Sequence, residues 1–128
     1  MIPSLVNYAE NFNPEDLVLE HARARGVEVG ANDISVGTGV FLQQLAHLLS
    51  AQSVVEVGTG SGVGSLYLLR GMIDSGTLTS IDDEIEHARI AKMAFYEAEI
   101  EAARFRLITN PVMDVLSKLT DRAYDLVL

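Results

Sequence analysis

A short apolar run followed by a glycine-rich segment is the clearest pattern along the chain. Residues 53–57 read SVVEV and are mostly β-branched, which is typical of a buried parallel strand. Four glycines follow within seven residues: Gly58, Gly60, Gly62 and Gly64. Residues 63–72 then continue as an apolar helical pattern. The pattern predicts a strand, a loop with bare backbone, and a helix whose first N–H groups face that loop.

Further elements are expected on both sides of this unit. After it, the pattern predicts strands at 77–82, 104–109 and 123–128, which alternate with helices at 84–102 and 113–119. Before it, helical patterns cover 4–11, 14–25 and 38–50, with a glycine-rich loop at 27–39. This order predicts an α/β fold, a Rossmann-like parallel sheet with helices on both faces, preceded by N-terminal helices. We expect one domain, 1–128, made of the N-terminal helices (1–50) and a β/α half (51–128).

The helices carry more detailed expectations. Asn13 and Pro14 are predicted to begin the second helix and Gly26 to end it. Its docking face is expected to consist of Leu17, Val18, His21 and Ala24. The apolar side of the third helix is expected to consist of Phe41, Leu42, Leu45, Leu48 and Leu49. In helix 84–102 the apolar stripe is expected at Ala88, Ala91, Phe95, Ala98 and Ala102, and His87 has no evident partner.

Composition and charge narrow the class of protein. The chain has 128 residues, of which 48% are hydrophobic, and its formal net charge is −9. This charge argues against a nucleic-acid partner, which needs a basic surface. The chain has no cysteine, so a disulfide or a thiolate nucleophile is excluded. We see no basic leader and no run of 18 apolar residues, so we expect a cytoplasmic protein without a membrane partner.

The glycine loop does not fit the dinucleotide fingerprint. G-x-G-x-x-G counted from Gly58 reaches Val63, and counted from Gly60 it reaches Ser65. Instead, Glu56 stands two residues before the first glycine, and Asp82 ends the second strand. Open α/β sheets bind ligands at this edge, where a carboxylate can accept ribose hydroxyls. The alternative for Asp82 is a helix-capping role.

The pattern acid-x-G-x-G-x-G, from Glu56 to Gly62, resembles the first motif of the class I S-adenosylmethionine-dependent methyltransferases. From about Asp33 onward the chain looks like the small O-methyltransferases related to caffeoyl-CoA and catechol O-methyltransferase. The segments that carry this resemblance are ISVGTG, VVEVGTGSGVGSLYLL, LTSIDDE and AYDLVL. The resemblance implies a class I methyltransferase fold with S-adenosylmethionine as cofactor. Its positive sulfonium suits a site with carboxylates.

The resemblance also implies roles for individual residues. Asp82 stands at the ribose position, Asp83 and Val112 beside the adenine, and Ile34 at the methionine end. Gly58 and Thr59 are expected to contact the cofactor through their backbone. Glu56 either meets the cofactor's amino group or orients the loop by accepting its N–H groups. Gly64 stands where many relatives carry a serine that meets the cofactor's carboxylate, and Ser65 is the candidate to replace it.

The implied activity is methyl transfer to a hydroxyl of a small phenolic or catechol-like acceptor, by a homodimer. In relatives, the acidic segment that holds a divalent cation such as Mg²⁺ follows the fourth strand. We therefore expect no catalytic residue and no metal ligand within these 128 residues, and a fragment that is poorly stable or self-associating. Two alternatives stay open: an NAD(P)-dependent oxidoreductase, and a non-catalytic interaction module that keeps the fold.

Overall fold

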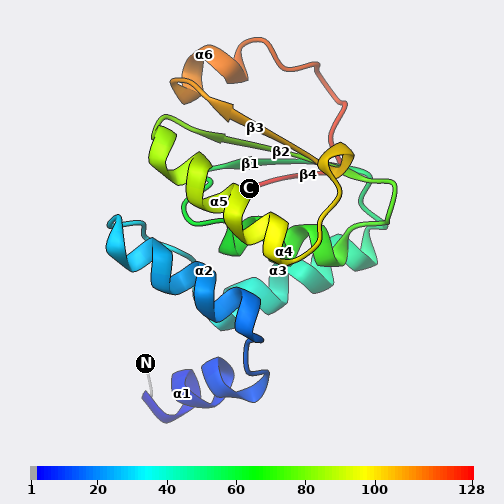
Figure 1. The fold of residues 1–128 in the computed structure, drawn as a ribbon. Helices are drawn as coiled ribbons and strands as arrows, with labels where there is room; N and C mark the ends of the chain where they lie inside the picture. The colour runs from blue at the N-terminus through cyan, green and yellow to red at the C-terminus, as the bar shows by residue number, and fades with distance from the viewer. Residues whose placement is uncertain (1–2) are drawn as a thin grey trace.

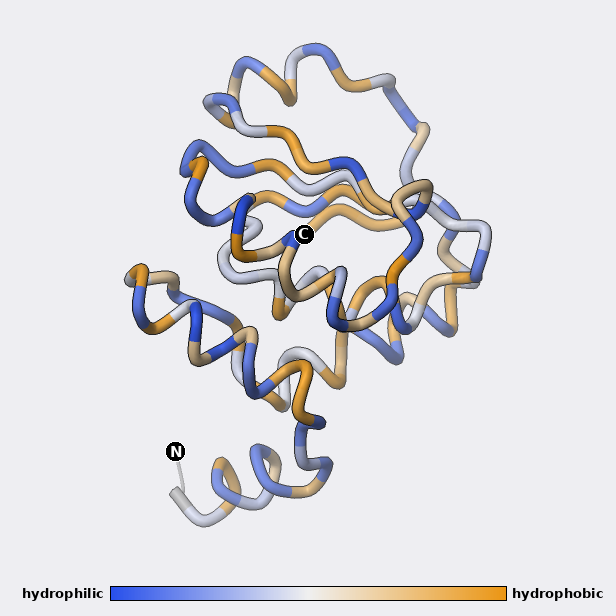
Figure 2. Tube along the Cα trace, in the orientation of Figure 1, coloured by the Kyte–Doolittle hydropathy of each residue, from blue (hydrophilic) through white to orange (hydrophobic). Residues whose placement is uncertain are grey.

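The computed structural model describes residues 3–128 and contains a four-stranded parallel sheet with the strand order β3-β2-β1-β4 (Figure 1). The strands are β1 (Ser53–Val57), β2 (Thr77–Asp82), β3 (Phe105–Thr109) and β4 (Leu126–Val127). The predicted bounds of the first two strands are confirmed. β3 begins one residue later than predicted because a 3₁₀ turn, Ala102–Arg104, precedes it, and β4 is shorter than predicted. Figure 2 shows hydrophobic residues along the central strands, as expected for a buried parallel sheet.

Helices cover both faces of the sheet, which confirms the predicted fold class. The helices are α1 (Pro3–Phe12), α2 (Leu17–Glu28), α3 (Val36–Leu48), α4 (Val63–Gly71), α5 (Ile85–Glu97) and α6 (Val112–Leu116). α4 and α5 pack on one face of the sheet and α6 on the other, while α2 and α3 lie outside α4 and α5 (Figure 1). α1 is outermost and contacts α3. Each helix therefore packs on a neighbouring layer, except that α1 leaves much of its surface to solvent.

The main core lies between the sheet and α4 and α5. Phe95 of α5 is fully buried, and the centroid of its ring lies 4.7 Å from the centroid of the Phe105 ring. α4 is buried nearly all round because α3 covers its outer side. Two glycines allow this close approach. A Cβ at Gly71 would lie 2.1 Å from the carbonyl oxygen of Gln43, and one at Gly39 would lie 2.2 Å from the ring of Tyr67.

The second helix differs from its prediction at both ends. Its N-cap is Asp16, whose carboxylate accepts the N–H of Leu19 at 3.1 Å, and not Asn13. The helix also runs through Gly26 to Glu28. Its buried residues are Leu19, Ala22 and Gly26, whereas Leu17 and His21 of the predicted docking face are exposed. The face that α2 buries is therefore turned away from the predicted one.

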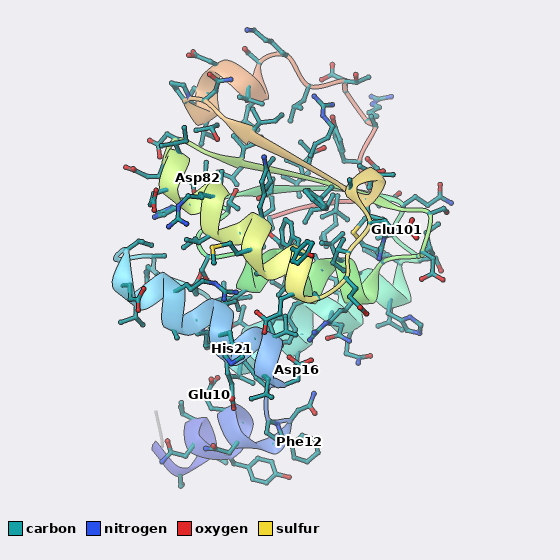
Figure 3. The ribbon with its side chains drawn as sticks, in the orientation of Figure 1. Glu10, Phe12, Asp16, His21, Asp82 and Glu101 are labelled. Atoms are coloured by element: carbon teal, nitrogen blue, oxygen red, sulfur yellow. The ribbon has the colours of Figure 1, made fainter. Side chains whose placement is uncertain are left out.

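The third helix begins at Val36, so the predicted loop at 27–39 is reduced to a short connection between α2 and α3. Ser35 caps the helix, and the Glu10 carboxylate of α1 accepts the N–H groups of Val36 and Gly37 (Figure 3). The predicted apolar face is only partly right. The buried residues of α3 are Gly39, Leu42 and Ala46, while Phe41, Leu48 and Leu49 are exposed.

The fifth helix ends at Glu97, five residues before the predicted end. Glu99 takes a left-handed conformation with φ of 58°, which stops the helix. The residues that α5 buries are Ile90, Ala91, Ala94 and Phe95. Of the predicted stripe, Ala88 and Ala98 are half-buried and Ala102 is exposed, so that stripe is right only at its centre.

Candidate active site

The glycine loop between β1 and α4 leaves its backbone open on one side. Gly58 and Gly62 have φ angles of 92° and 91°, a region that residues with a side chain rarely occupy. A Cβ at Gly58 would meet no atom within 4 Å, so this part of the loop faces free space. A Cβ at Gly62 would lie 3.2 Å from Ala91, so the other end of the loop packs on α5. The loop is thus anchored at one end and bare at the other, which allows a ligand to approach the backbone of Gly58.

Asp82 lies at the carboxyl end of β2, beside this loop (Figure 3). Its Oδ2 accepts the N–H of Gly60 at 3.1 Å, and its Oδ1 accepts the N–H of Glu84 at 2.9 Å. The Nδ1 atom of His87 lies 3.0 Å from the same Oδ2, so His87 has a partner that the sequence did not reveal. Burial alone would raise the pKa of Asp82, but the hydrogen bonds from Glu84, His87 and Gly60 lower it below its usual value. Asp82 is therefore a charged acceptor at the loop.

Glu56 lies on β1 beneath the loop and is only 2% exposed. Its Oε2 accepts the hydroxyl groups of Ser65 and, at 2.8 Å, Ser80. Ser80 in turn shares a 2.7 Å hydrogen bond with the hydroxyl of Thr59. Burial raises the pKa of Glu56 to about 7, since the two serine hydrogen bonds offset only part of the cost of desolvation. The repulsion from Asp33 and Asp82 adds to this rise.

Gly64 and Ser65 lie next to Glu56. A Cβ at Gly64 would lie 2.7 Å from Glu56 Oε1 and 3.7 Å from the side chain of Ile34. The hydroxyl of Ser65, the candidate to replace a serine at position 64, is buried and donates to Glu56. The reason is the helical turn of about 100° per residue, which directs Ser65 inward. The structure thus brings Ile34, Glu56 and Gly64 together at one side of the loop.

The remaining predicted residues lie around this centre. Asp83 follows Asp82 and is exposed. Val112 begins α6 and packs with the cluster of Val55 and Ile81, on the face of the sheet opposite α5. Thr59 is buried, and its hydroxyl is directed to Ser80, so only its backbone is left for a ligand.

Asp33 is a site residue that the sequence analysis did not single out. Its Oδ1 accepts the N–H of Ser61 at 3.1 Å, and its Oδ2 accepts the hydroxyl of Ser61 at 2.6 Å. These bonds join the connection between α2 and α3 to the glycine loop. A Cβ at Gly26 would lie 2.3 Å from Asp33 Oδ2 and one at Gly60 2.7 Å from Oδ1, so both glycines make room for this carboxylate. One feature of the sequence could have indicated this role: Asp33 is an acid directly before Ile34, in a segment without helical or strand periodicity.

Within residues 3–128 we find no group of three or more His, Asp or Glu side chains that could hold a metal ion. The acids Asp33, Glu56 and Asp82 are each held by hydrogen bonds within the protein. In the same range, every helix is too short or too polar to cross a lipid bilayer.

Known proteins resemble this chain along nearly its whole length. A protein of Mycolicibacterium vanbaalenii, provisionally named an O-methyltransferase, is 49% identical over 124 residues, which make up 97% of this chain and 55% of that protein. A Corynebacterium glutamicum crystal structure matches with a TM-score of 0.89 at 33% identity, covering 98% of this chain and 59% of that one. The O-methyltransferase TomG of Streptomyces achromogenes, solved in complex with S-adenosylmethionine, matches with a TM-score of 0.84 at 27% identity. This match covers 95% of this chain and 56% of TomG.

The chain therefore spans about half the length of the curated relatives it matches. The sequence profile described as O-methyltransferase matches residues 9–128. On this match, which covers far more than half of the sequence, the chain belongs to the O-methyltransferase family.

Proposed function

We propose that this chain forms the S-adenosylmethionine-binding part of an O-methyltransferase that acts on a hydroxyl group of a small phenolic or catechol-like acceptor. The observation that carries the proposal is the Asp82 carboxylate, which the Gly60 N–H holds at the open side of the glycine loop. The complex of TomG with S-adenosylmethionine supports the choice of cofactor. Because the chain matches about half of its relatives, the complete reaction is proposed for the whole protein.

In this proposal Asp82 accepts a ribose hydroxyl, and the bare backbone at Gly58 and Thr59 lies against the cofactor. The free space at Gly58 fits this role, because no atom occupies the direction of its missing side chain. Ile34 contacts the methionine end, while Asp83 and Val112 flank the adenine. Glu56 Oε1 faces the position of Gly64, where it can accept a hydrogen bond from the amino group of the cofactor.

Charge supports the choice of ligand. Asp33 and Asp82 place carboxylates around the loop, Glu56 adds negative charge where it is ionised, and the chain has a net charge of −9. A cofactor with a phosphate group would be repelled here, whereas a cationic sulfonium and an ammonium group are attracted. Asp82, Ile34 and the backbone at Gly58 would hold S-adenosylmethionine, which would supply an electrophilic methyl group for the acceptor. The residues of this chain bind and orient the donor. We assign no metal-binding role to residues 3–128, since they offer no suitable ligand set.

We also propose that the protein is a homodimer. α1 supports this, because it exposes Leu5, Tyr8 and Phe12 at 63–72% of their surface. Multi-angle light scattering of the wild type and of Phe12→Ser tests it. A concentration-independent monomer in the wild type contradicts the dimer.

Titration calorimetry with S-adenosylhomocysteine and with NAD tests the cofactor. We expect S-adenosylhomocysteine to bind and NAD to show no heat. Asp82→Ala should abolish the binding, while Asp74→Ala, which removes an exposed acid in the turn before β2, should leave it unchanged. Preferential binding of NAD would favour the oxidoreductase alternative, and binding of neither ligand would favour the interaction module.

A further inference from the structure

The contact between His87 and Asp82 is not explained by the proposed function alone. His87 lies in the first turn of α5, and its backbone N–H donates to the carbonyl oxygen of Glu84 at 3.1 Å. This turn brings the ring back over the end of β2, where Nδ1 lies 3.0 Å from Asp82 Oδ2. The two side chains are 19% and 9% exposed. The pair is thus partly shielded from water, so that its hydrogen bond competes with solvent less than a surface contact does.

The hydrogen bonds that Asp82 accepts are distributed unequally over its two oxygens. A carboxylate offers about four acceptor positions. On Oδ2, two of them are taken by the Gly60 N–H and by His87, while Oδ1 accepts only the Glu84 N–H. About one acceptor position is therefore left on the carboxylate, and it lies on Oδ1.

We propose that His87 is a positioning residue for cofactor binding: its Nδ1–H holds Asp82 Oδ2, so that Oδ1 is presented to a ribose hydroxyl. This inference rests on the proposed function. The terminal torsion of an aspartate side chain is broad, so a carboxylate that loses one of its donors can rotate. The backbone donors Gly60 and Glu84 fix only one direction at each oxygen. The imidazole adds the second donor on Oδ2, which stops Oδ2 from competing for the ligand.

The charges near His87 agree with this role. Asp83 and Glu84 precede the helix and Glu86 lies in its first turn, where its Oε1 accepts the Nε–H of Arg89 at 2.8 Å. Among the described hydrogen bonds, His87 is the one side-chain donor to Asp82. The lowered pKa of Asp82 includes a contribution from this bond. Removing it should therefore be detectable in Asp82 itself, without any ligand.

Two variants test the proposal. His87→Leu removes the donor, and His87→Asn keeps an N–H group at nearly the same distance from the helix backbone. Calorimetry should show that His87→Leu binds S-adenosylhomocysteine about tenfold more weakly than the wild type, and His87→Asn within about threefold. The 2′,3′-dideoxy form of the ligand should bind wild type and His87→Leu alike, because it has no hydroxyl for Asp82 to accept. Circular dichroism checks that each variant is folded.

A second readout does not need the ligand. The pKa of Asp82, followed by carbon NMR of its carboxyl group, should rise in His87→Leu and stay low in His87→Asn. An equal loss of affinity for both ligands would show a general structural role, and unchanged or tighter binding would show that His87 does not position Asp82; each result overturns the proposal. If wild type does not bind S-adenosylhomocysteine, the proposed function fails and the ribose role of His87 fails with it. The NMR result then shows whether the contact alone exists.

Discussion

Replacing Glu56 by glutamine should remove a loss of stability that the wild type suffers as the pH rises. Burial raises the pKa of Glu56 from 4.5 to about 7, against the hydrogen bonds from Ser65 and Ser80. The folded chain therefore holds this proton more tightly than the unfolded chain. The resulting stabilisation is complete below pH 4.5 and is lost as the pH rises through about 7.

The size of the effect follows from the two pKa values. Each pKa unit corresponds to about 1.4 kcal/mol, so the free energy of unfolding should fall by about 2–3 kcal/mol between pH 5 and pH 8. This is a large part of the roughly 5–15 kcal/mol that stabilises a typical domain. In a chain of this size it lowers the Tm by about 10 °C. Glutamine has nearly the same shape, and its oxygen can still accept the two serine hydroxyls, but it carries no charge at any of these pH values.

Thermal unfolding followed by circular dichroism, at constant ionic strength and at four values of pH from 5 to 8, measures this. The wild type should lose stability across the series, and Glu56→Gln should stay nearly level. Glu101→Gln is the matched control, since it removes the same charge from an exposed position (Figure 3). Asp82 and Asp125 do not disturb the comparison, because their lowered pKa values place their loss of stabilisation at more acidic pH. A Glu56→Gln protein that loses as much stability as the wild type between pH 5 and pH 8 would refute the assignment to this carboxyl group.

Three further predictions concern the scaffold of the site. Asp33→Asn should speed amide hydrogen exchange at Ser61, because an amide group cannot replace both acceptor contacts of the carboxylate; unchanged exchange would contradict this. Gly71→Ala should lower the free energy of unfolding by about 1–3 kcal/mol in a denaturant titration, since the added Cβ would lie 2.1 Å from the carbonyl oxygen of Gln43, and any gain in stability would refute this packing. Asp125→Asn should speed amide hydrogen exchange at Gln52 and Ser53, whose N–H groups donate to the Asp125 carboxylate at 2.7 and 3.0 Å. Equal exchange rates in the variant and the wild type would show that these bonds do not hold β4 to β1.

The strands and the glycine loop could be predicted because their signals are local. The β-branched run of β1 and most residues of β2 are buried, and the parallel register of these strands places Asp82 at the same edge as the loop. The sequence also placed Ile34 near the site through its resemblance to a family. Here, tertiary structure agrees with local preference.

The faces of the outer helices could not be predicted in the same way. Phe41 and Leu48 of α3 are exposed although they are large and apolar, whereas Gly39, Leu42 and Ala46 are buried. Periodicity identifies an apolar side only when the partner surface is flat enough for large residues. Where two helices approach closely, small residues take the contact, and this distance is set by the partner and not by the helix itself.

Side-chain contacts between distant segments could not be predicted from the sequence either. Asp33 meets Ser61 across 28 positions, and neither residue stands out by periodicity. His87 lies only five positions from Asp82, but their contact depends on where β2 ends and α5 begins. Element boundaries are the least certain part of a prediction from sequence, so a contact that depends on them is uncertain too.

The connection between α2 and the loop can be tested at Gly26, where two physical effects oppose each other. Alanine normally stabilises a helix interior by about 1 kcal/mol relative to glycine. At Gly26, however, the new Cβ would lie 2.3 Å from Asp33 Oδ2 and 3.0 Å from the side chain of Ser61. We expect the contact to dominate, so that Gly26→Ala displaces the Asp33 carboxylate and speeds amide exchange at Ser61.

A double-mutant cycle separates the two effects, because it measures only the coupling between positions 26 and 33. With Asp33→Ala as the background, most of the obstruction is gone. Gly26→Ala should then give more of its normal helix stabilisation and should change the exchange of Ser61 little further. If Gly26→Ala instead stabilises the protein equally in both backgrounds, α2 does not press on Asp33. The carboxylate would then hold the glycine loop without help from this helix, and the close approach of α2 would have no part in shaping the site.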